Sequence, residues 1–210
     1  MAALPPPGTS PKEFLEQWLP KAAAEQPLPE AAKTADVKLG VRLEGEGGGD
    51  WVFHLREGQL SIAPGPTEES AFTLIQSVAD WRGALWEERG GAFGKQASAL
   101  FRPGAQSSQP AGGGPGGRPL DPSSLGKLAA LRGVIRMVVS GGADGEWKVD
   151  FKLGPGPIPA EPTTTVTVTA DDAAAMERGE LDPMQAFMSG RIMIAGDMGL
   201  LMQMQMMTMA

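Results

Sequence analysis

The chain has 210 residues and no cysteine, which excludes disulfides, thiolate metal sites and cysteine nucleophiles. Its formal net charge of −7 argues against binding to nucleic acid, which requires clustered Lys and Arg, and against docking on anionic membranes. No apolar run approaches the roughly 20 residues of a membrane span, and the N-terminus lacks the pattern of a signal peptide. We therefore expect a cytoplasmic globular protein without stable membrane insertion.

The first predicted helix begins at the sequence SPKE, residues 10–13, which has the pattern of a capping box. The residues that follow place Phe14, Leu15, Trp18 and Leu19 on one apolar stripe. We expect this helix to cover a sheet in the first half of the chain.

Two stretches of the chain share one pattern, a strand, a Gly-rich acidic turn, a Trp-led alternating strand and a Gly/Pro break. They are residues 41–66, VRLEGEGGGDWVFHLREGQLSIAPGP, and residues 135–157, IRMVVSGGADGEWKVDFKLGPGP, in which Trp51 corresponds to Trp147. A β-rich run and then a helical pattern follow each stretch. Collinear similarity of this kind predicts an internal duplication.

Residues 103–119, PGAQSSQPAGGGPGGRP, have the composition of a flexible Gly/Pro linker. The sequence therefore predicts a first domain over residues 1–102 and a second over residues 120–210. The second has room for one helix, at about residues 122–132, before its first strand.

Residues 147–153 alternate strictly between apolar and polar, which is typical of an antiparallel strand with one wet face. Residues 163–169 are rich in β-branched side chains and predict another strand. Helices beside such sheets indicate an α+β fold. We expect tandem domains, each with a mostly antiparallel sheet of about five strands and helices packed on one face.

The C-terminal region predicts a helix, a short strand and a further element. Asp182 caps the helix, Pro183 occupies its first turn and Gly190 ends it. Residues 191–195 form the strand. The last ten residues fit either a helix or a strand, because the run Met-Gln-Met-Gln-Met at 202–206 alternates with period two.

The second half resembles the sterol carrier protein-2 family, the sterol-transfer domain, over residues 135–209. The most specific part of the resemblance is residues 179–200, GELDPMQAFMSGRIMIAGDMGL, in which the family's landmarks fall in order without a gap. The sequence departs from the family pattern in having Asp182 where Asn is usual, and it ends in Thr208-Met209-Ala210 instead of a peroxisomal import tripeptide. Residues 10–102 resemble a degenerate second copy.

The resemblance implies an apolar cavity between sheet and helices that holds a sterol, fatty acid, fatty acyl-CoA or phospholipid. It implies a helix lining the cavity at residues 184–189 and a closing element at residues 198–207. The expected lipid-binding residues are Val149, Phe151, Met184, Phe187, Met188, Ile192, Ile194, Met198, Leu201, Met202 and Gln205.

Eleven of the twelve methionines lie between residues 137 and 209. Methionine is unbranched and polarizable, so it can line a cavity that accepts lipids of several shapes. The same side chains can equally fill a solid core. The sequence leaves both readings open.

The chain offers little for catalysis or metal binding. His54 is the only histidine, and it is expected to face solvent on its strand. With no Cys and one His, we do not expect a zinc site of the common type. No serine has the context of a nucleophile elbow, so we expect no enzymatic activity, no catalytic residue, no metal and no cofactor.

We therefore predict a soluble lipid-binding or transfer protein, either monomer or homodimer, whose partner is an apolar lipid and not nucleic acid. The alternative is a non-enzymatic interaction, dimerisation or accessory module with a filled core.

Overall fold

The computed structural model describes residues 4–25, 33–102 and 129–209, with side chains described as far as residue 203 in the last range. The helices are α1 (Pro11–Glu13), η1 (Phe14–Trp18), α2 (Leu19–Ala24), α3 (Val78–Trp86), α4 (Gly91–Ala99), α6 (Ala170–Glu177), α7 (Pro183–Met188) and α8 (Met198–Met209). The strands are β1 (Asp36–Glu44), β2 (Gly49–Arg56), β3 (Gln59–Pro64), β4 (Phe72–Ser77), β5 (Gly133–Gly142), β6 (Gly145–Leu153), β7 (Thr164–Thr169) and β8 (Ile192–Gly196).

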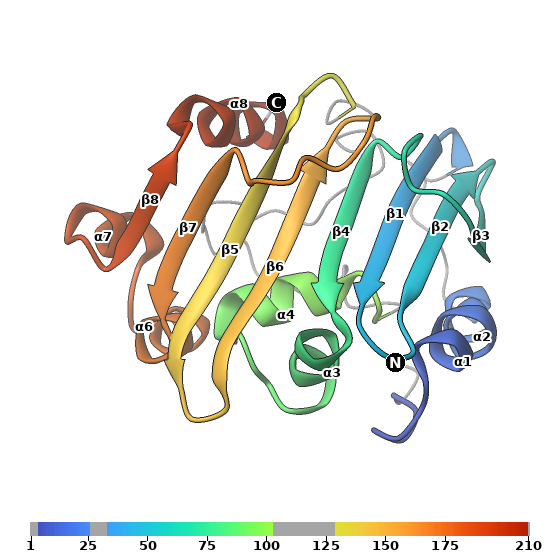
Figure 1. Cartoon of the computed structure of the whole chain (residues 1–210), viewed down its shortest axis with the longest axis horizontal. Coiled ribbons are helices and arrows are strands. Elements are labelled where there is room, and N and C mark those ends of the chain that lie inside the picture. The colour runs from blue at the N-terminus through green and yellow to red at the C-terminus, as the bar shows by residue number, and fades with distance from the viewer. Residues whose placement is uncertain (1–3, 26–32, 103–128, 210) are drawn as a thin grey trace.

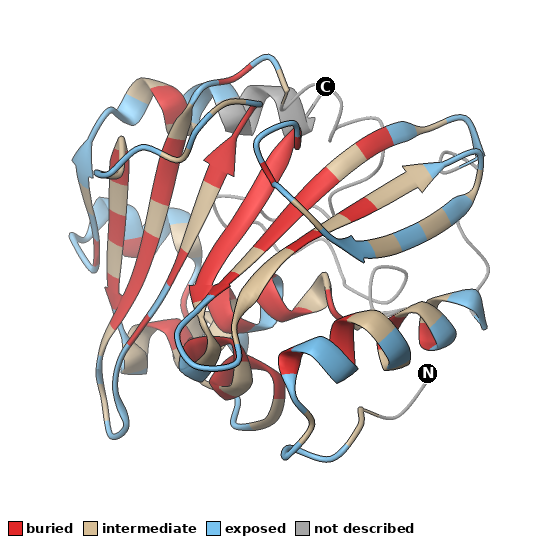
Figure 2. Ribbon diagram, turned by 45° about the vertical axis from the view of Figure 1, so that its right-hand side comes forward, coloured by how far each residue is buried: buried red, intermediate tan, exposed pale blue. Residues whose placement is uncertain are grey.

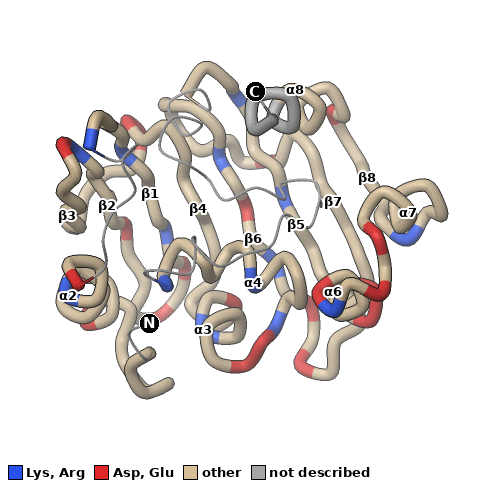
Figure 3. Tube along the Cα trace, turned by 180° about the vertical axis from the view of Figure 1, so that it is seen from behind, with Lys and Arg blue, Asp and Glu red and all other residues tan. Residues whose placement is uncertain are grey.

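All eight strands join in one sheet with the order β3-β2-β1-β4-β6-β5-β7-β8 (Figure 1). Five of the neighbouring pairs are antiparallel, and only β1–β4 and β5–β7 are parallel. Helices α2, α3, α4 and α6 lie over the same face of this sheet (Figure 3). The α+β class, the mostly antiparallel pairing and the helices on one face are confirmed.

The prediction of two separate sheets of about five strands each is wrong, because the described strands form one continuous eight-stranded sheet. In the first half, Glu57 and Gly58 both adopt positive φ, 51° and 75°, and close the tight β2–β3 hairpin. The corresponding residues after β6, GPGPIPAEP at 154–162, form no strand, because proline lacks the N–H that a ladder requires.

Strand β4 occupies the open edge of β6. It pairs antiparallel with β6 from Phe72↔Leu153 to Ile75↔Asp150, as β3 pairs with β2. The rings of Phe72 and Phe151 stack across this junction with centroids 5.5 Å apart. The first half therefore supplies the strand that the second half lacks.

The two halves repeat one strand arrangement. In each, the first strand lies between an antiparallel neighbour and a parallel one, β2–β1–β4 and β6–β5–β7. The parallel strand then leads into a helix with the same cap, Ser77 accepting from the Asp80 N–H and Thr169 from the Asp172 N–H. This agrees with the predicted duplication, while the domain boundaries remain a prediction. The linker at 103–119, and residues 122–128 of the helix expected at 122–132, lie outside the described residues, and residues 129–132 form a turn and a loop.

The core lies between the sheet and the helices, and Figure 2 shows buried residues running along the central strands. In the first half an aromatic cluster fills it, with edge-to-face contacts of Phe14 to Trp81, Trp86 and Phe101. The capping box at residues 10–13 is confirmed in part, because the Ser10 Oγ accepts from the Glu13 N–H. The helix that follows covers the first half as expected.

Candidate functional site

Helix α7 begins and ends at the predicted residues. The Asp182 carboxylate accepts from the N–H groups of Met184 and Gln185 at 2.9 and 3.0 Å, and Pro183 stands at the first helical position. Gly190 adopts a φ of 73° just beyond the helix. Ala186 is fully buried, so it anchors α7 on the core and leaves the long side chains on either side of it directed outward.

Strand β8 and helix α8 complete the C-terminal region. The Thr164 hydroxyl donates to the Asp197 carbonyl at 2.6 Å, and the Asp197 carboxylate accepts from the Gly199 N–H at 2.7 Å. These bonds fix the turn between strand and helix. Residues 198–209 are helical, which settles the alternative that the sequence left open, and Leu200 packs into the core.

The large hydrophobic side chains that are exposed in the described part of the chain all lie in α7, β8 and α8. Met188 is the most exposed of them at 78%, and Met184 and Met193 follow at 62% each. Outside a binding surface, apolar side chains in such density are uncommon on a protein surface. The full set is Met184, Phe187, Met188, Met193, Met198 and Met202.

Four of the predicted lipid-binding residues lie on the helix-covered face of the sheet. Val149 and Ile192 are buried, and Phe151 and Ile194 are partly buried. The strand register joins Val149 to Ile194 through Met137 and Val166, so one apolar row crosses four strands. The sequence prediction missed Met137 and Val166, although both belong to strands with recognisable patterns.

The structure places the other predicted residues on the two flanking helices. Leu201 is partly buried on α8 and packs against the core. Gln205 lies in α8, but its side chain is outside the described residues. The predicted lipid-binding residues thus fall into two groups. One group lies on the helix-covered face of the sheet. The other group is exposed on α7 and α8 and consists of Met184, Phe187, Met188, Met198 and Met202.

Charged residues are few along α7, β8 and the described start of α8 (Figure 3). The Arg191 guanidinium donates to the Asp172 carboxylate at 2.8 Å, and Asp182 and Asp197 act as caps. A surface with so few charges offers little to a polar ligand and favours an apolar one.

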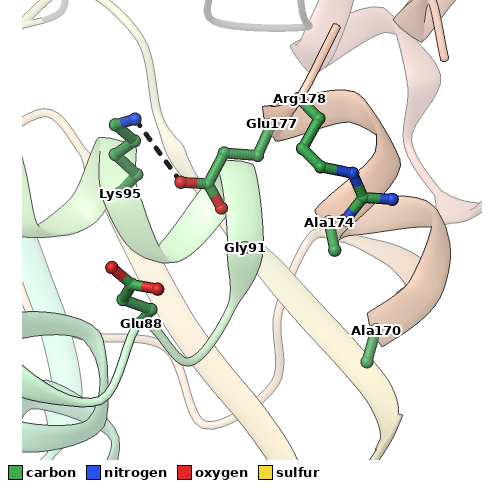
Figure 4. A pocket seen from close by; sticks show the side chains of 7 residues that line it. All are labelled: Glu88, Gly91, Lys95, Ala170, Ala174, Glu177 and Arg178. Atoms are coloured by element: carbon green, nitrogen blue, oxygen red, sulfur yellow. Dashed lines mark ion pairs between the residues drawn. The ribbon is translucent and has the colours of Figure 1, made fainter. Parts of the chain in front are cut away.

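A pocket of about 420 Å³ lies elsewhere, between α4 and α6, and is lined mainly by polar groups and alanines (Figure 4). Lys95 and Glu177 form an ion pair at 3.4 Å on its wall. The expected apolar cavity is a different place. In the row that crosses the sheet there, Val149 and Val166 are buried and Ile194 is partly buried.

Several other polar groups in the described part of the chain are held in structural contacts. Arg42 and Arg136 each form two bonds to a carboxylate across the sheet, Asp50 and Asp150, and this hydrogen bonding raises the pKa of both guanidinium groups. His54 is 2.7 Å from Asp36, whose pKa is lowered by that hydrogen bond. No three potential ligands gather to hold a metal ion within the described ranges, and none of the helices described there is long and apolar enough to cross a bilayer.

The C-terminal region is similar to a known protein family. Residues 117–208 match the model of the SCP-2 sterol transfer family. The resemblance inferred from the sequence over residues 135–209 is thereby confirmed. The match does not reach residues 10–102, so the degenerate second copy remains a prediction.

Two curated proteins are similar to part of this chain. The chain is 37% identical over 83 residues to hydroxysteroid dehydrogenase-like protein 2 of Xenopus tropicalis, covering 37% of this chain and 20% of that protein. It is 36% identical over 69 residues to sterol carrier protein 2 of Rattus norvegicus, covering 31% of this chain and 13% of that protein. The chain thus spans a fifth or less of the length of these curated relatives.

Among solved structures, the sterol carrier protein domain 2 of Helicoverpa armigera is 27% identical over 39% of this chain and 71% of its own, with a TM-score of 0.30. Sterol carrier protein 2 like 2 of Aedes aegypti is 21% identical over 40% of this chain and 87% of its own, with a TM-score of 0.29.

Proposed function

We propose that this chain, whose residues 117–208 form a region of the SCP-2 sterol transfer family, binds an apolar lipid between its C-terminal sheet and helices α7 and α8. The observation that carries the proposal is the confinement of the exposed large hydrophobic side chains, within the described residues, to α7, β8 and α8. The ligand classes are a sterol, a fatty acid, a fatty acyl-CoA or a phospholipid.

The lipid tail contacts the exposed side chains of α7 and α8 and extends toward the sheet. Phe187 and Met184 come from α7, Met198 and Met202 from α8, and Ile194 from the sheet between them. Methionine adapts its shape to an irregular apolar ligand. The partly buried Phe151 and Leu201 mark the inner limit of the site, where the core is already packed.

The energetics suit a carrier. Each buried methylene contributes about 0.8 kcal/mol, so a tail of about 15 methylenes gains roughly 12 kcal/mol gross. Immobilisation of the ligand and ordering of its chain offset several kcal/mol of this gain, which leaves a dissociation constant on the order of micromolar. A carrier with this affinity holds its ligand and still releases it. The proposal assigns no catalytic step to the chain.

The first test substitutes Phe187→Asp and measures uptake of a fluorescent fatty acid. Phe187 is 37% exposed, so the variant keeps its fold, while a carboxylate in the apolar site raises the dissociation constant by about tenfold or more. The matched control is Val52→Asp, because Val52 is a partly exposed valine on β2, far from α7 in the sheet order. We expect the control to bind like the wild type.

Native mass spectrometry of the purified protein complements this test by detecting lipid that copurifies. A wild type that carries no lipid and takes up no fatty acid at tens of micromolar overturns the proposal. Equal loss of uptake in Phe187→Asp and Val52→Asp overturns the location of the site.

A second candidate function is an interaction or accessory module with a filled core. The observation that favours it is the burial of Val149, Met137 and Val166 in the row that crosses the sheet. The alternative predicts a wild type without bound lipid whose contacts with other proteins depend on the same exposed methionines.

A further inference from the structure

The outer edge of β8 is an open edge of the sheet. β8 is last in the strand order and, among the described strands, pairs only with β7. Natural sheets protect such edges with proline, charged side chains or a covering helix. At the opposite edge, β3 carries Pro64 and contacts α2. β8 contacts α7, which lies beside it in Figure 1, but its own sequence, IMIAG, has neither proline nor charge.

We propose that two copies of the chain associate through this edge, with β8 pairing antiparallel to the partner's β8 around Ile194. This inference goes beyond the proposed lipid binding and does not depend on it. A symmetric antiparallel pairing about Ile194 sets Ile192 opposite the partner's Gly196 and Met193 opposite the partner's Ala195. Ile192 and Met193 thus each meet a small residue, and Ile194 meets the partner's Ile194.

The charges at the two ends of β8 are self-complementary in the same register. Arg191 precedes the strand and Asp197 follows it, each three residues from Ile194. The pairing sets Arg191 opposite the partner's Asp197, and two-fold symmetry makes this contact twice. Both ends therefore attract, although each chain carries a net charge of −7 that opposes association at most other surfaces.

The two charged groups have free bonding capacity for a partner. The Arg191 side chain is 56% exposed and uses one terminal nitrogen for the Asp172 carboxylate. A guanidinium has five donors, so it can bind a second carboxylate. The Asp197 residue is exposed, and its recorded side-chain bond, to the Gly199 N–H, uses one of its two oxygens.

Association through β8 also covers apolar surface. Met193 lies on the strand itself at 62% exposure, and Met188 and Met198 stand beside its two ends. The pairing satisfies the outward backbone groups of β8, which a lipid bilayer cannot do. This difference favours a second copy over a membrane as the occupant of the edge.

The test uses sedimentation velocity on the full chain and on two charge-reversal variants. Arg191→Asp alone sets a new carboxylate opposite the partner's Asp197, and Asp197→Arg alone sets a new guanidinium opposite the partner's Arg191, so both variants repel themselves. We expect the wild type to form a dimer whose population rises with concentration, and each variant to dissociate at a concentration about tenfold or more higher. A mixture of the two variants places opposite charges at each end of the paired strands, so we expect it to form a heterodimer.

Recovery in the mixture cannot come from misfolding of either variant, because each contributes the charge that the other lacks. Met193→Lys is the supporting variant, since an edge lysine opposes strand pairing at an exposed position. The proposal is overturned if the wild type stays monomeric at high concentration, or if the mixture dissociates like its components. Cosedimentation of a monomeric wild type with phosphatidylcholine vesicles would also overturn it and assign the edge to a bilayer.

Fatty-acid uptake by the dissociated variants separates this inference from the proposed function. We expect it to persist, because the side chains of α7, α8 and β8 that are assigned to the lipid belong to each single copy.

Discussion

Lys152 is a charged residue that is buried in the interior of this fold. It lies on β6 at 3% exposure, and its ammonium donates to the Gly154 carbonyl at 2.9 Å. Burial lowers the pKa of the Lys152 ammonium below its ordinary value of 10.5, and the negative charge of Glu68 opposes this shift only in part. The alternation of β6 predicts this lysine on a wet face, but loop contacts such as that of the Gly156 N–H with the Glu68 carbonyl cover that face locally.

We predict that Lys152→Met raises the free energy of unfolding by about 1 kcal/mol at neutral pH, because a buried charge is replaced by an apolar chain of similar length. The folded protein releases the Lys152 proton at lower pH than the unfolded chain does. The unfolded state therefore binds more protons in this range, and the stability of the wild type rises as the pH increases toward 10.5. The difference in the free energy of unfolding between variant and wild type should therefore become smaller as the pH approaches 10.5. Urea unfolding at several pH values measures it.

The control for this prediction is Lys148→Met, the same substitution at an exposed position on the same strand. It should change the free energy of unfolding by no more than a few tenths of a kcal/mol relative to the wild type, and this change should not vary with pH in the same way. A Lys152→Met variant that is less stable at every pH would mean that the bond to Gly154 outweighs the desolvation of the ammonium.

At the scale of elements, the stability of helix α7 depends on the hydrogen bonds of its first turn. It has six residues, and its long apolar side chains gain little from the core because Ala186 is its buried contact. A helix this short has marginal stability of its own. Its N-terminal cap and its position between α6 and β8 therefore decide whether the exposed methionines are held in place.

We predict that Asp182→Ala lowers the free energy of unfolding by about 1 kcal/mol, because the N–H groups of Met184 and Gln185 lose their acceptor. Amide hydrogen exchange should accelerate at these two residues, with a smaller change in α6. Asp182→Asn is the control, since its side-chain oxygen can accept the same bonds. Equal exchange in the Ala and Asn variants would show that packing, and not the cap, holds α7.

At the scale of the whole molecule, the two halves are joined by more than the chain between them. The Trp147 indole N–H donates to the Asp80 carbonyl at 2.9 Å, and Arg89 donates to the carbonyls of Asp144 and Glu146. The Gly154 N–H donates to the Ala71 carbonyl beside the β4–β6 ladder. Each half therefore buries part of its surface on the other.

We predict that residues 1–102 and 103–210, produced as separate fragments, do not unfold cooperatively on their own. The second fragment lacks β4, which leaves the β6 edge and Phe151 uncovered, and Trp147 loses its partner. Mixing the fragments should restore a cooperative thermal transition and a one-to-one complex by native mass spectrometry. A cooperative transition in fragment 103–210 alone would show that its sheet needs no strand from the first half.

The sequence by itself determined the elements and their local chemistry, because these depend on near neighbours along the chain. The capped helix at Asp182 and the alternating strand from Trp147 follow from spacing and side-chain type alone, and the motif at residues 179–200 carries the resemblance to the family. Their positions in the structure agree with those predictions.

Only the tertiary structure decided how the strands share edges and which apolar side chains remain outside. Whether β4 pairs with β6 depends on an edge that Pro155 and its neighbours leave open, and on the stacking of Phe72 with Phe151, two residues far apart in sequence. The sequence pattern of Met188 and Met193 is the same whether they line a cavity, fill a core or face outward. Their exposure is set by the packing of whole elements against one another, which no local pattern encodes.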